Sequence, residues 1–236
     1  MLEPRRNLTH QLVHHLGTAI LKGEYKIGDR LPTEAVISEE FQISRTATRE
    51  AIKILSAKGL IQTKARNGIT VQPLETWNLF DAEVLNWILS GKPDLYMLRS
   101  FLQLRLSIEP QAAYIAAQQA KPENLIAIEE ALKRMKNATT SDDNTLEADI
   151  DFHKSILSAT NNPFFIQLIN FVVIALRVNM RFTDRVKPVT SEEYQAHADI
   201  YAHIKNKDSQ SAYDAALKPQ QATLDIVNTK IRALKE

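Results

Sequence analysis

Residues 33–58 contain two short amphipathic segments joined by a tight connection, and this feature restricts the possible fold more than any other. The first segment covers residues 33–41 and the second residues 44–58, with only Gln42 and Ile43 between them. In the second segment, apolar residues recur at helical spacing: Ala47, Ala51, Ile54 and Leu55. This spacing predicts a helix with one buried face. Two helices joined by so short a turn are typical of a helix-turn-helix.

The start of the second helix carries polar residues that suit a nucleic-acid surface. Ser44 is placed to cap the helix, and Arg45, Thr46 and Arg49 lie on the face opposite the apolar one. Arginine suits guanine edges and phosphates, and threonine suits a thymine methyl group or a phosphate oxygen. The alternative is an Arg-rich helical turn that is merely solvated.

The residues after this helix predict a β-hairpin. Gly59 is placed to end the helix. Residues 62–64 and 69–71 then read as two short strands, and Asn67-Gly68 between them allows positive φ. This is the pattern of a winged helix, with Lys64 and Arg66 near the wing tip and an additional helix expected over residues 8–22.

Together these residues resemble the N-terminal signature of the GntR family of bacterial transcription regulators. The matching positions are Gly23, residues 31–34, Phe41, Ser44, Arg45, residues 49–51, residues 59–61, Gly68 and Val71. The resemblance implies that Ser44, Arg45, Thr46 and Arg49 face DNA, with Asn67 and Gly68 at the wing tip. Many members carry Arg where this chain has Ala35, so no DNA contact is carried over for that position.

Composition agrees with a DNA-binding part joined to a separate module. Residues 1–72 contain eleven Lys or Arg and seven Asp or Glu, a net charge of +4, whereas the remaining residues carry a net charge of −3. A chance imbalance of a few charges is the alternative. The chain has no cysteine, which excludes a disulfide framework and thiolate chemistry. With no apolar run of membrane-spanning length, a cytoplasmic protein is expected.

The sequence predicts a mainly α fold, a winged helix-turn-helix followed by an all-α bundle of six or seven helices. We expect the DNA-binding domain over residues 1–72, a linker and the first helix of the effector domain over residues 73–90, and the all-α effector-binding and dimerisation domain over residues 91–236. The expected helices span residues 77–89, 95–119, 122–135, 145–160, 164–181, 190–206 and 209–234. Pro110 and Pro219 should kink or interrupt their helices. Thr190 and Glu193 form a capping-box pattern.

Within the predicted bundle, three residues suit a metal ion. Asp149 and His153 are four residues apart, so they share one face of a helix, and His197 lies in a later helix. Imidazole and carboxylate groups suit Zn²⁺ or another first-row divalent ion. The alternative is an ordinary surface hydrogen bond between Asp149 and His153.

The helical part resembles the FCD ligand-binding domain of the FadR-type branch of the family. Its metal-binding version has an Asp-x-x-x-His helix, a second His at the start of a later helix and a third His in the last helix. The resemblance implies that Asp149, His153 and His197 are ligands, and that Gln220 stands where the last His is expected. Gln220, water or an effector oxygen would then complete the site, with Zn²⁺ as the expected ion and Ni²⁺ or Mn²⁺ as alternatives.

Further residues resemble the subgroup of this branch that regulates galactonate operons: Trp77, Asn78, Asp81, Trp87, residues 147–150, His153 and Asn162. This implies a sugar acid as effector. The family often places an Arg at the position of Arg105, which makes it the best candidate to bind a carboxylate or hydroxyl. Arg177 starts a stripe with Arg181 and Arg185, which is either an exposed basic edge or part of the pocket.

The sequence thus predicts a dimeric, effector-controlled repressor of sugar-acid catabolic genes that binds a pseudo-palindromic operator. A metal-dependent hydrolase is the first alternative, but the chain has no His-Glu-x-x-His run. An architectural DNA-binding protein is the second.

Overall fold

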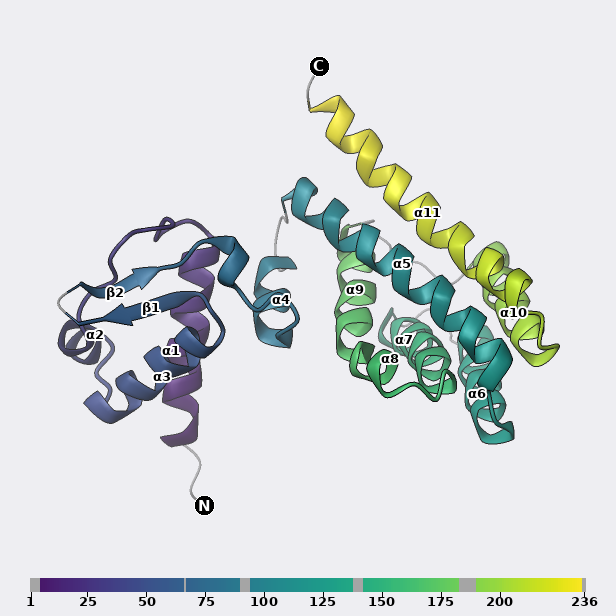
Figure 1. Cartoon of the computed structure of the whole chain (residues 1–236), viewed down its shortest axis with the longest axis horizontal. Helices are drawn as coiled ribbons and strands as arrows, with labels where there is room; N and C mark the ends of the chain where they lie inside the picture. Colours follow the sequence, from purple (N-terminus) through teal and green to yellow (C-terminus); the bar gives the residue numbers. More distant parts are fainter. Residues whose placement is uncertain (1–4, 66, 90–93, 138–141, 183–189, 235–236) are drawn as a thin grey trace. The chain divides into compact units, whose positions relative to one another are not determined.

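The computed structural model describes residues 5–65, 67–89, 94–137, 142–182 and 190–234. The chain divides into two compact units, Met1–Ser90 and Gly91–Glu236. The first combines helices with a two-stranded sheet, and the described residues of the second form helices (Figure 1). The predicted fold class, a winged helix-turn-helix followed by an all-α bundle, is confirmed.

The N-terminal unit contains the helix-turn-helix and its wing. Its elements are α1 (Arg5–Leu21), α2 (Glu34–Glu40), α3 (Arg45–Ala57), β1 (Ile61–Lys64), β2 (Gly68–Val71), the 3₁₀ helix η1 (Leu74–Thr76) and α4 (Ala82–Leu89). β1 and β2 pair antiparallel, with Ile61 opposite Val71 and Lys64 opposite Gly68. Ile61, Ile69 and Val71 are buried, so one face of the wing closes over the helices.

Side-chain caps set the ends of the two central helices. Thr33 accepts a hydrogen bond from the Val36 N–H at 3.4 Å, and Ser44 accepts one from the Ala47 N–H at 3.2 Å. Each bond satisfies a backbone donor that has no partner within its helix. Between the helices, Gln42 has a φ of 52°, the left-handed conformation that lets the chain reverse over two residues.

The buried face of α3 differs slightly from the predicted one. Ala51 and Leu55 are buried as expected, whereas Ala47 and Ile54 are only partly buried. Thr48 and Ile52 are buried instead, and the Thr48 hydroxyl donates to the Ser44 carbonyl at 3.2 Å, so its burial leaves no hydroxyl hydrogen without a partner.

Residues 73–89 pack within the N-terminal unit. The sequence predicted instead that they form a linker and the first helix of the effector domain. Val84 and Trp87 of α4 belong to the same buried cluster as Leu12 and Leu16 of α1. The Trp77 indole N–H donates to the Gln72 carbonyl at 2.9 Å. The boundary was predicted at residue 72 because the wing ends there. Burial of Val84 and Trp87 against α1 instead keeps α4 with the N-terminal unit.

Helix α4 is shorter than the predicted helix over residues 77–89. Asp81 accepts hydrogen bonds from the Glu83 and Val84 N–H groups at 3.0 and 3.1 Å, so the helix begins there. The Lys58 ammonium, on the C-cap of α3, lies 2.7 Å from the Asp81 carboxylate and 2.8 Å from that of Glu83. This buried lysine therefore joins the end of α3 to the start of α4.

The C-terminal unit contains seven described helices, whereas six of the predicted helices fall within it. The helix expected over residues 77–89 belongs to the N-terminal unit, and the one expected over residues 164–181 forms two helices. The seven described helices are α5 (Leu95–Gln119), α6 (Pro122–Asn137), α7 (Asp142–Ala159), α8 (Pro163–Gln167), α9 (Ile169–Phe182), α10 (Ser191–Lys205) and α11 (Ser209–Ala233). Helices α5 and α11 lie side by side and make the most extensive contact, and α7 packs on α5, α6 and α9 (Figure 1).

One expectation for this unit needs correction, and one is confirmed. Pro110 and Pro219 lie inside α5 and α11 without interrupting either helix, and a kink at each stays a prediction. The single helix expected over residues 164–181 is divided, because Leu168 closes α8 with a hydrogen bond from its N–H to the Phe165 carbonyl at 3.0 Å. The capping box at Thr190 is present as predicted.

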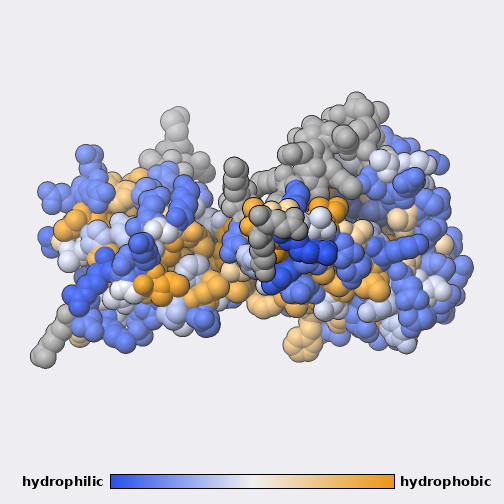
Figure 2. Space-filling view, turned by 90° about the horizontal axis from the view of Figure 1, so that it is seen from above, coloured by the Kyte–Doolittle hydropathy of each residue, from blue (hydrophilic) through white to orange (hydrophobic). Residues whose placement is uncertain are grey.

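On the face shown in Figure 2, the described residues are largely hydrophilic, with hydrophobic residues in patches. None of the described helices combines the length and the apolarity that crossing a membrane would require.

Gly59 provides a test of how closely η1 packs against the end of α3. It has a φ of 78°, and a Cβ there would meet the Thr76 carbonyl oxygen at 1.9 Å. Gly23, with a φ of 76°, has nothing within 4 Å of its Cβ position and serves as the control. We expect Gly23→Ala to lower the free energy of unfolding by about 1–2 kcal/mol, and Gly59→Ala by roughly 1–3 kcal/mol more because backbone must shift.

Urea unfolding of the full chain, followed by tryptophan fluorescence, would measure both changes. Both tryptophans, Trp77 and Trp87, lie in the N-terminal unit, so the signal reports on that unit alone. Equal losses in the two variants would contradict the close approach of η1 to Gly59.

Candidate functional site

The first candidate site is the exposed face of α3. Arg45, Thr46 and Arg49 are exposed on its first turns, as predicted, and Ser44 is the N-cap. The Arg49 side chain, 65% exposed, lies 3.2 Å from the Glu34 carboxylate of α2. An exposed ion pair contributes about 0–1 kcal/mol, so Arg49 can exchange this partner for a phosphate or a base.

The wing adds a second group of exposed residues to this unit. Lys64, Asn67 and Gly68 are exposed, and Gly68 has a φ of 74° that turns the chain into β2. Arg66, the other predicted wing residue, lies outside the described residues. An open groove between α3 and β1 is lined in part by Arg49, Lys53, Gln62 and Thr63. The sequence analysis did not identify Lys53, Gln62 or Thr63. Lys53 follows Arg49 by four residues, so the two residues lie on the same face of α3.

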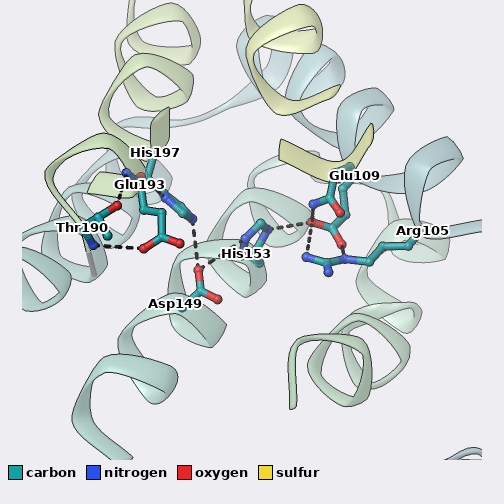
Figure 3. Close-up of polar contacts among 8 residues, drawn as sticks. Arg105, Glu109, Asp149, His153, Thr190, Glu193 and His197 are labelled. Atoms are coloured by element: carbon teal, nitrogen blue, oxygen red, sulfur yellow. Dashed lines mark hydrogen bonds and ion pairs between the residues drawn. The ribbon is translucent and has the colours of Figure 1, made fainter. Parts of the chain in front are cut away.

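The second candidate site brings together Asp149, His153 and His197 in the C-terminal unit (Figure 3). Asp149 and His153 lie on α7, and His197 lies on α10. The Asp149 Oδ1 atom is 3.5 Å from His153 Nε2 and 3.0 Å from His197 Nε2. Among the described residues, these three offer ligand atoms that all lie within 4.8 Å of one another.

This geometry fits a first-row divalent cation. Ligands about 2.0–2.1 Å from a tetrahedral Zn²⁺ lie about 3.3 Å from one another, close to the 3.0 and 3.5 Å separations from Asp149. Two imidazole nitrogens and a carboxylate oxygen form a donor set that Zn²⁺, Ni²⁺ and Mn²⁺ accept. The three side chains are 11–23% exposed, so the group is sheltered but reachable.

The capping box of α10 orients His197. Thr190 and Glu193 exchange hydrogen bonds of 2.9 and 3.1 Å, which fixes the first turn of the helix. The Glu193 carbonyl oxygen then lies 2.7 Å from His197 Nδ1. A carbonyl can only accept, so Nδ1 carries the hydrogen and Nε2 is the nitrogen turned toward Asp149 (Figure 3).

A buried carboxylate orients His153 in the same way. Glu109 Oε2 of α5 lies 2.7 Å from His153 Nδ1, which leaves Nε2 facing Asp149. Arg105, one turn earlier on α5, forms an ion pair with Glu109, and the Gln220 amide of α11 donates to Glu109 Oε2 at 2.8 Å. Sequence reasoning missed Glu109. The sequence feature that could have identified Glu109 is an Arg and a Glu four residues apart in a stretch that is otherwise largely apolar.

The neighbouring charges of Arg105, Glu109, His153 and Asp149 stabilise one another's ionised forms. Burial on its own raises the pKa of Glu109, but the Arg105 and His153 cations lower it to about 2. Burial likewise opposes the cationic form of His153, yet the Glu109 and Asp149 carboxylates raise its pKa to about 9. The pKa of Asp149 falls below its usual range because hydrogen bonds from both histidines outweigh its burial. Of the two carboxylates, Asp149 is the one that faces the proposed cation position, and Glu109 lies behind His153.

The other predicted residues lie as follows. Arg105 and Gln220 are buried and both contact Glu109. Arg177 is exposed and pairs with Glu147 of α7 at 2.8 Å. The side chain of Arg181 and all of Arg185 lie outside the described part of the chain.

Comparisons with known proteins agree with this two-part organisation. Residues 8–71 match the family model "Bacterial regulatory proteins, gntR family", and residues 100–218 match that of the FCD domain. The chain is 32% identical over 234 residues to the galactonate operon transcriptional repressor of Escherichia coli K12, covering 98% of each protein. It is 34% identical over 229 residues to YieP, an uncharacterised HTH-type transcriptional regulator of the same organism, covering 94% of this chain and 95% of YieP.

The fold also matches solved structures. The E. coli protein McbR/YncC aligns with a TM-score of 0.52 at 19% identity, covering 98% of this chain and all of that one. The order of the two parts along the chain is thus also found in a solved structure. The chain belongs to the GntR family of bacterial regulatory proteins, in the FadR-type branch with an FCD domain, and it is a transcriptional regulator rather than an enzyme.

Proposed function

We propose that this regulator represses sugar-acid catabolic genes and that a small carboxylate, bound in a metal-containing pocket of the FCD domain, releases it from its operator. The observation that carries the proposal is the convergence of the His153 and His197 Nε2 atoms on Asp149 Oδ1. Both rings are oriented through Nδ1, as histidine ligands of metal ions are. The similarity to a galactonate operon repressor supports the sugar-acid class.

DNA binding is assigned to α3 and the wing. Arg45, Thr46 and Arg49 would enter the major groove from the N-terminal turns of α3, beside Ser44. Lys64, Arg66, Asn67 and Gly68 would contact phosphates or the minor groove from the wing. In a homodimer, two such units related by a two-fold axis would read a pseudo-palindromic operator in the cytoplasm.

The effector is assigned to the C-terminal unit. Asp149, His153 and His197 would hold Zn²⁺, or Ni²⁺ or Mn²⁺, and Gln220, water or the effector would supply the remaining oxygen. A bound divalent ion supplies a positive centre for the carboxylate and α-hydroxyl of a sugar acid. Arg105, buried beside this group, and Arg177, exposed on α9, are the proposed anion contacts. Release requires that the effector bind the DNA-competent and DNA-incompetent states unequally.

The first prediction concerns α3. Arg45→Ala and Arg49→Ala should each weaken operator binding by roughly 1–3 kcal/mol if a bidentate base contact is lost, and loss of a phosphate contact should reduce the salt slope by about one. The measurement is fluorescence anisotropy with a duplex that the wild-type protein selects from a random-sequence pool. Arg232→Ala, which removes an exposed arginine from α11, is the matched control. Unchanged affinity in both α3 variants would refute the assignment.

The second prediction concerns the metal ion. Protein prepared without a His-tag should carry up to one divalent ion per chain by elemental analysis, and His153→Ala should abolish it because a ligand is lost. His203→Ala is the control, since His203 lies on α10 but outside the three-residue group. Protein that carries no metal and whose melting temperature does not respond to Zn²⁺, Ni²⁺ or Mn²⁺ would contradict the site.

The third prediction concerns the effector. Galactonate, tested first among aldonates and uronates, should lower operator affinity by about 5–150-fold, the usual range of allosteric coupling. Arg105→Lys keeps a positive charge beside Glu109 but loses the bidentate fork, so it should abolish or strongly reduce this response and leave DNA binding without effector unchanged.

The response is measured by titrating effector into a labelled operator complex. Arg134→Lys, an exposed arginine paired with Asp151, is the control. A normal response of Arg105→Lys at the wild-type effector concentration would exclude Arg105 from the pocket. If no aldonate or uronate releases the wild-type protein, the sugar-acid assignment is wrong.

A further inference from the structure

Glu109 is a buried carboxylate that the proposed ligand set does not use. Its side chain is 4% exposed and lies on α5. Arg105 reaches it from the same helix, His153 from α7 and Gln220 from α11. Removing an ionised carboxylate from water costs several kcal/mol unless its hydrogen-bonding sites are filled. Contacts from three helices fill them here.

These contacts leave the Glu109 carboxylate little freedom to rotate. The Arg105 Nε–H donates to Oε1, while the Arg105 Nη2 atom, 3.4 Å away, and the Gln220 amide both contact Oε2. The bond from His153 Nδ1 also ends on Oε2, at 2.7 Å. Both oxygens are therefore engaged, and the acceptor that faces His153 is held in place.

The fixed acceptor determines which nitrogen of His153 faces the three-residue group. Glu109 pairs with the Arg105 guanidinium and accepts from the Gln220 amide, so this carboxylate is the acceptor and the hydrogen of this bond belongs to Nδ1. Nε2 is then the nitrogen directed at Asp149, where His197 Nε2 also points (Figure 3). Without Glu109, rotation of the ring could present either nitrogen or a carbon to Asp149.

We propose that Glu109 is a positioning residue for the metal site: it holds the Nδ1–H of His153, and Arg105 and Gln220 hold Glu109 in turn. This inference rests on the proposed function, since it assumes that the Nε2 atoms bind a cation. An acceptor on the far nitrogen fixes the tautomer of a ligating histidine and makes its ligand nitrogen more basic. Glu109 would thereby strengthen cation binding without contacting the cation.

The test is the Zn²⁺ affinity of the full chain, measured by competition with a chromophoric chelator. Glu109→Gln removes the charge and should weaken Zn²⁺ binding by about 10–100-fold, the usual effect of losing such a partner. Asp151→Asn is the matched control, because Asp151 lies on the same helix as Asp149 and His153 but pairs with Arg134 and Lys154. Its Zn²⁺ affinity should stay within about two-fold of the wild type, since this carboxylate orients no ligand.

Two further measurements test the inference even if Glu109→Gln does not fold. Arg105→Gln with Glu109→Gln removes both charges together, so no buried cation is left unpaired, and the same loss of affinity is expected. In the wild-type protein, ¹¹³Cd²⁺ bound to ¹⁵N-labelled chain should couple to Nε2 of His153, while Nδ1 keeps its hydrogen. A purely structural role for Glu109 would not determine which nitrogen couples.

The outcomes separate this inference from the proposed function. Weaker Zn²⁺ binding by the Glu109 variants, with cadmium coupling to Nε2 in the wild type, supports it. Wild-type affinity in a folded Glu109 variant, or coupling to Nδ1 of His153, overturns it and leaves the metal site standing. A wild-type chain that binds neither Zn²⁺ nor Cd²⁺ overturns the metal site and this inference together.

Discussion

The Glu109 carboxylate is the constraint on which the arrangement of the C-terminal unit depends. An ionised group that is 4% exposed is tolerated only when its partners are in place, and these come from α5, α7 and α11. Any packing that separates these helices leaves a buried charge unpaired. Apolar contacts alone would tolerate small shifts between helices, whereas this charge specifies one arrangement.

The same carboxylate lies between the two chemical features of the unit. On one side it contacts His153, whose other nitrogen faces Asp149 and His197. On the other it pairs with Arg105, the proposed contact for an anion. An acid that drew Arg105 away from Glu109 would alter the support of His153, so anion and cation binding are expected to influence one another. This offers a physical route by which a small ligand could favour one packing of the helices over another.

Much of the fold could be predicted because its signals are local. The caps at Ser44 and Thr190 and the helical spacing of Asp149 and His153 depend on residues within four positions of one another. The features that were missed depend on distant residues. Glu109 accepts a hydrogen bond from Gln220, 111 residues away, and Asp81 at the start of α4 pairs with Lys58, 23 residues earlier. No local pattern reveals such pairs.

The packing of α4 also determines where the regulator can be divided. Leu12 and Leu16 of α1 share their buried cluster with Val84 and Trp87, and Lys58 is paired with Asp81 and Glu83. A hybrid regulator that joined residues 1–72 to a foreign effector domain would expose this apolar surface and leave a lysine without its counter-charges. A junction placed after Leu89 would carry the whole cluster with the DNA-reading module, so modular exchange among relatives should follow the buried surface rather than the end of the wing.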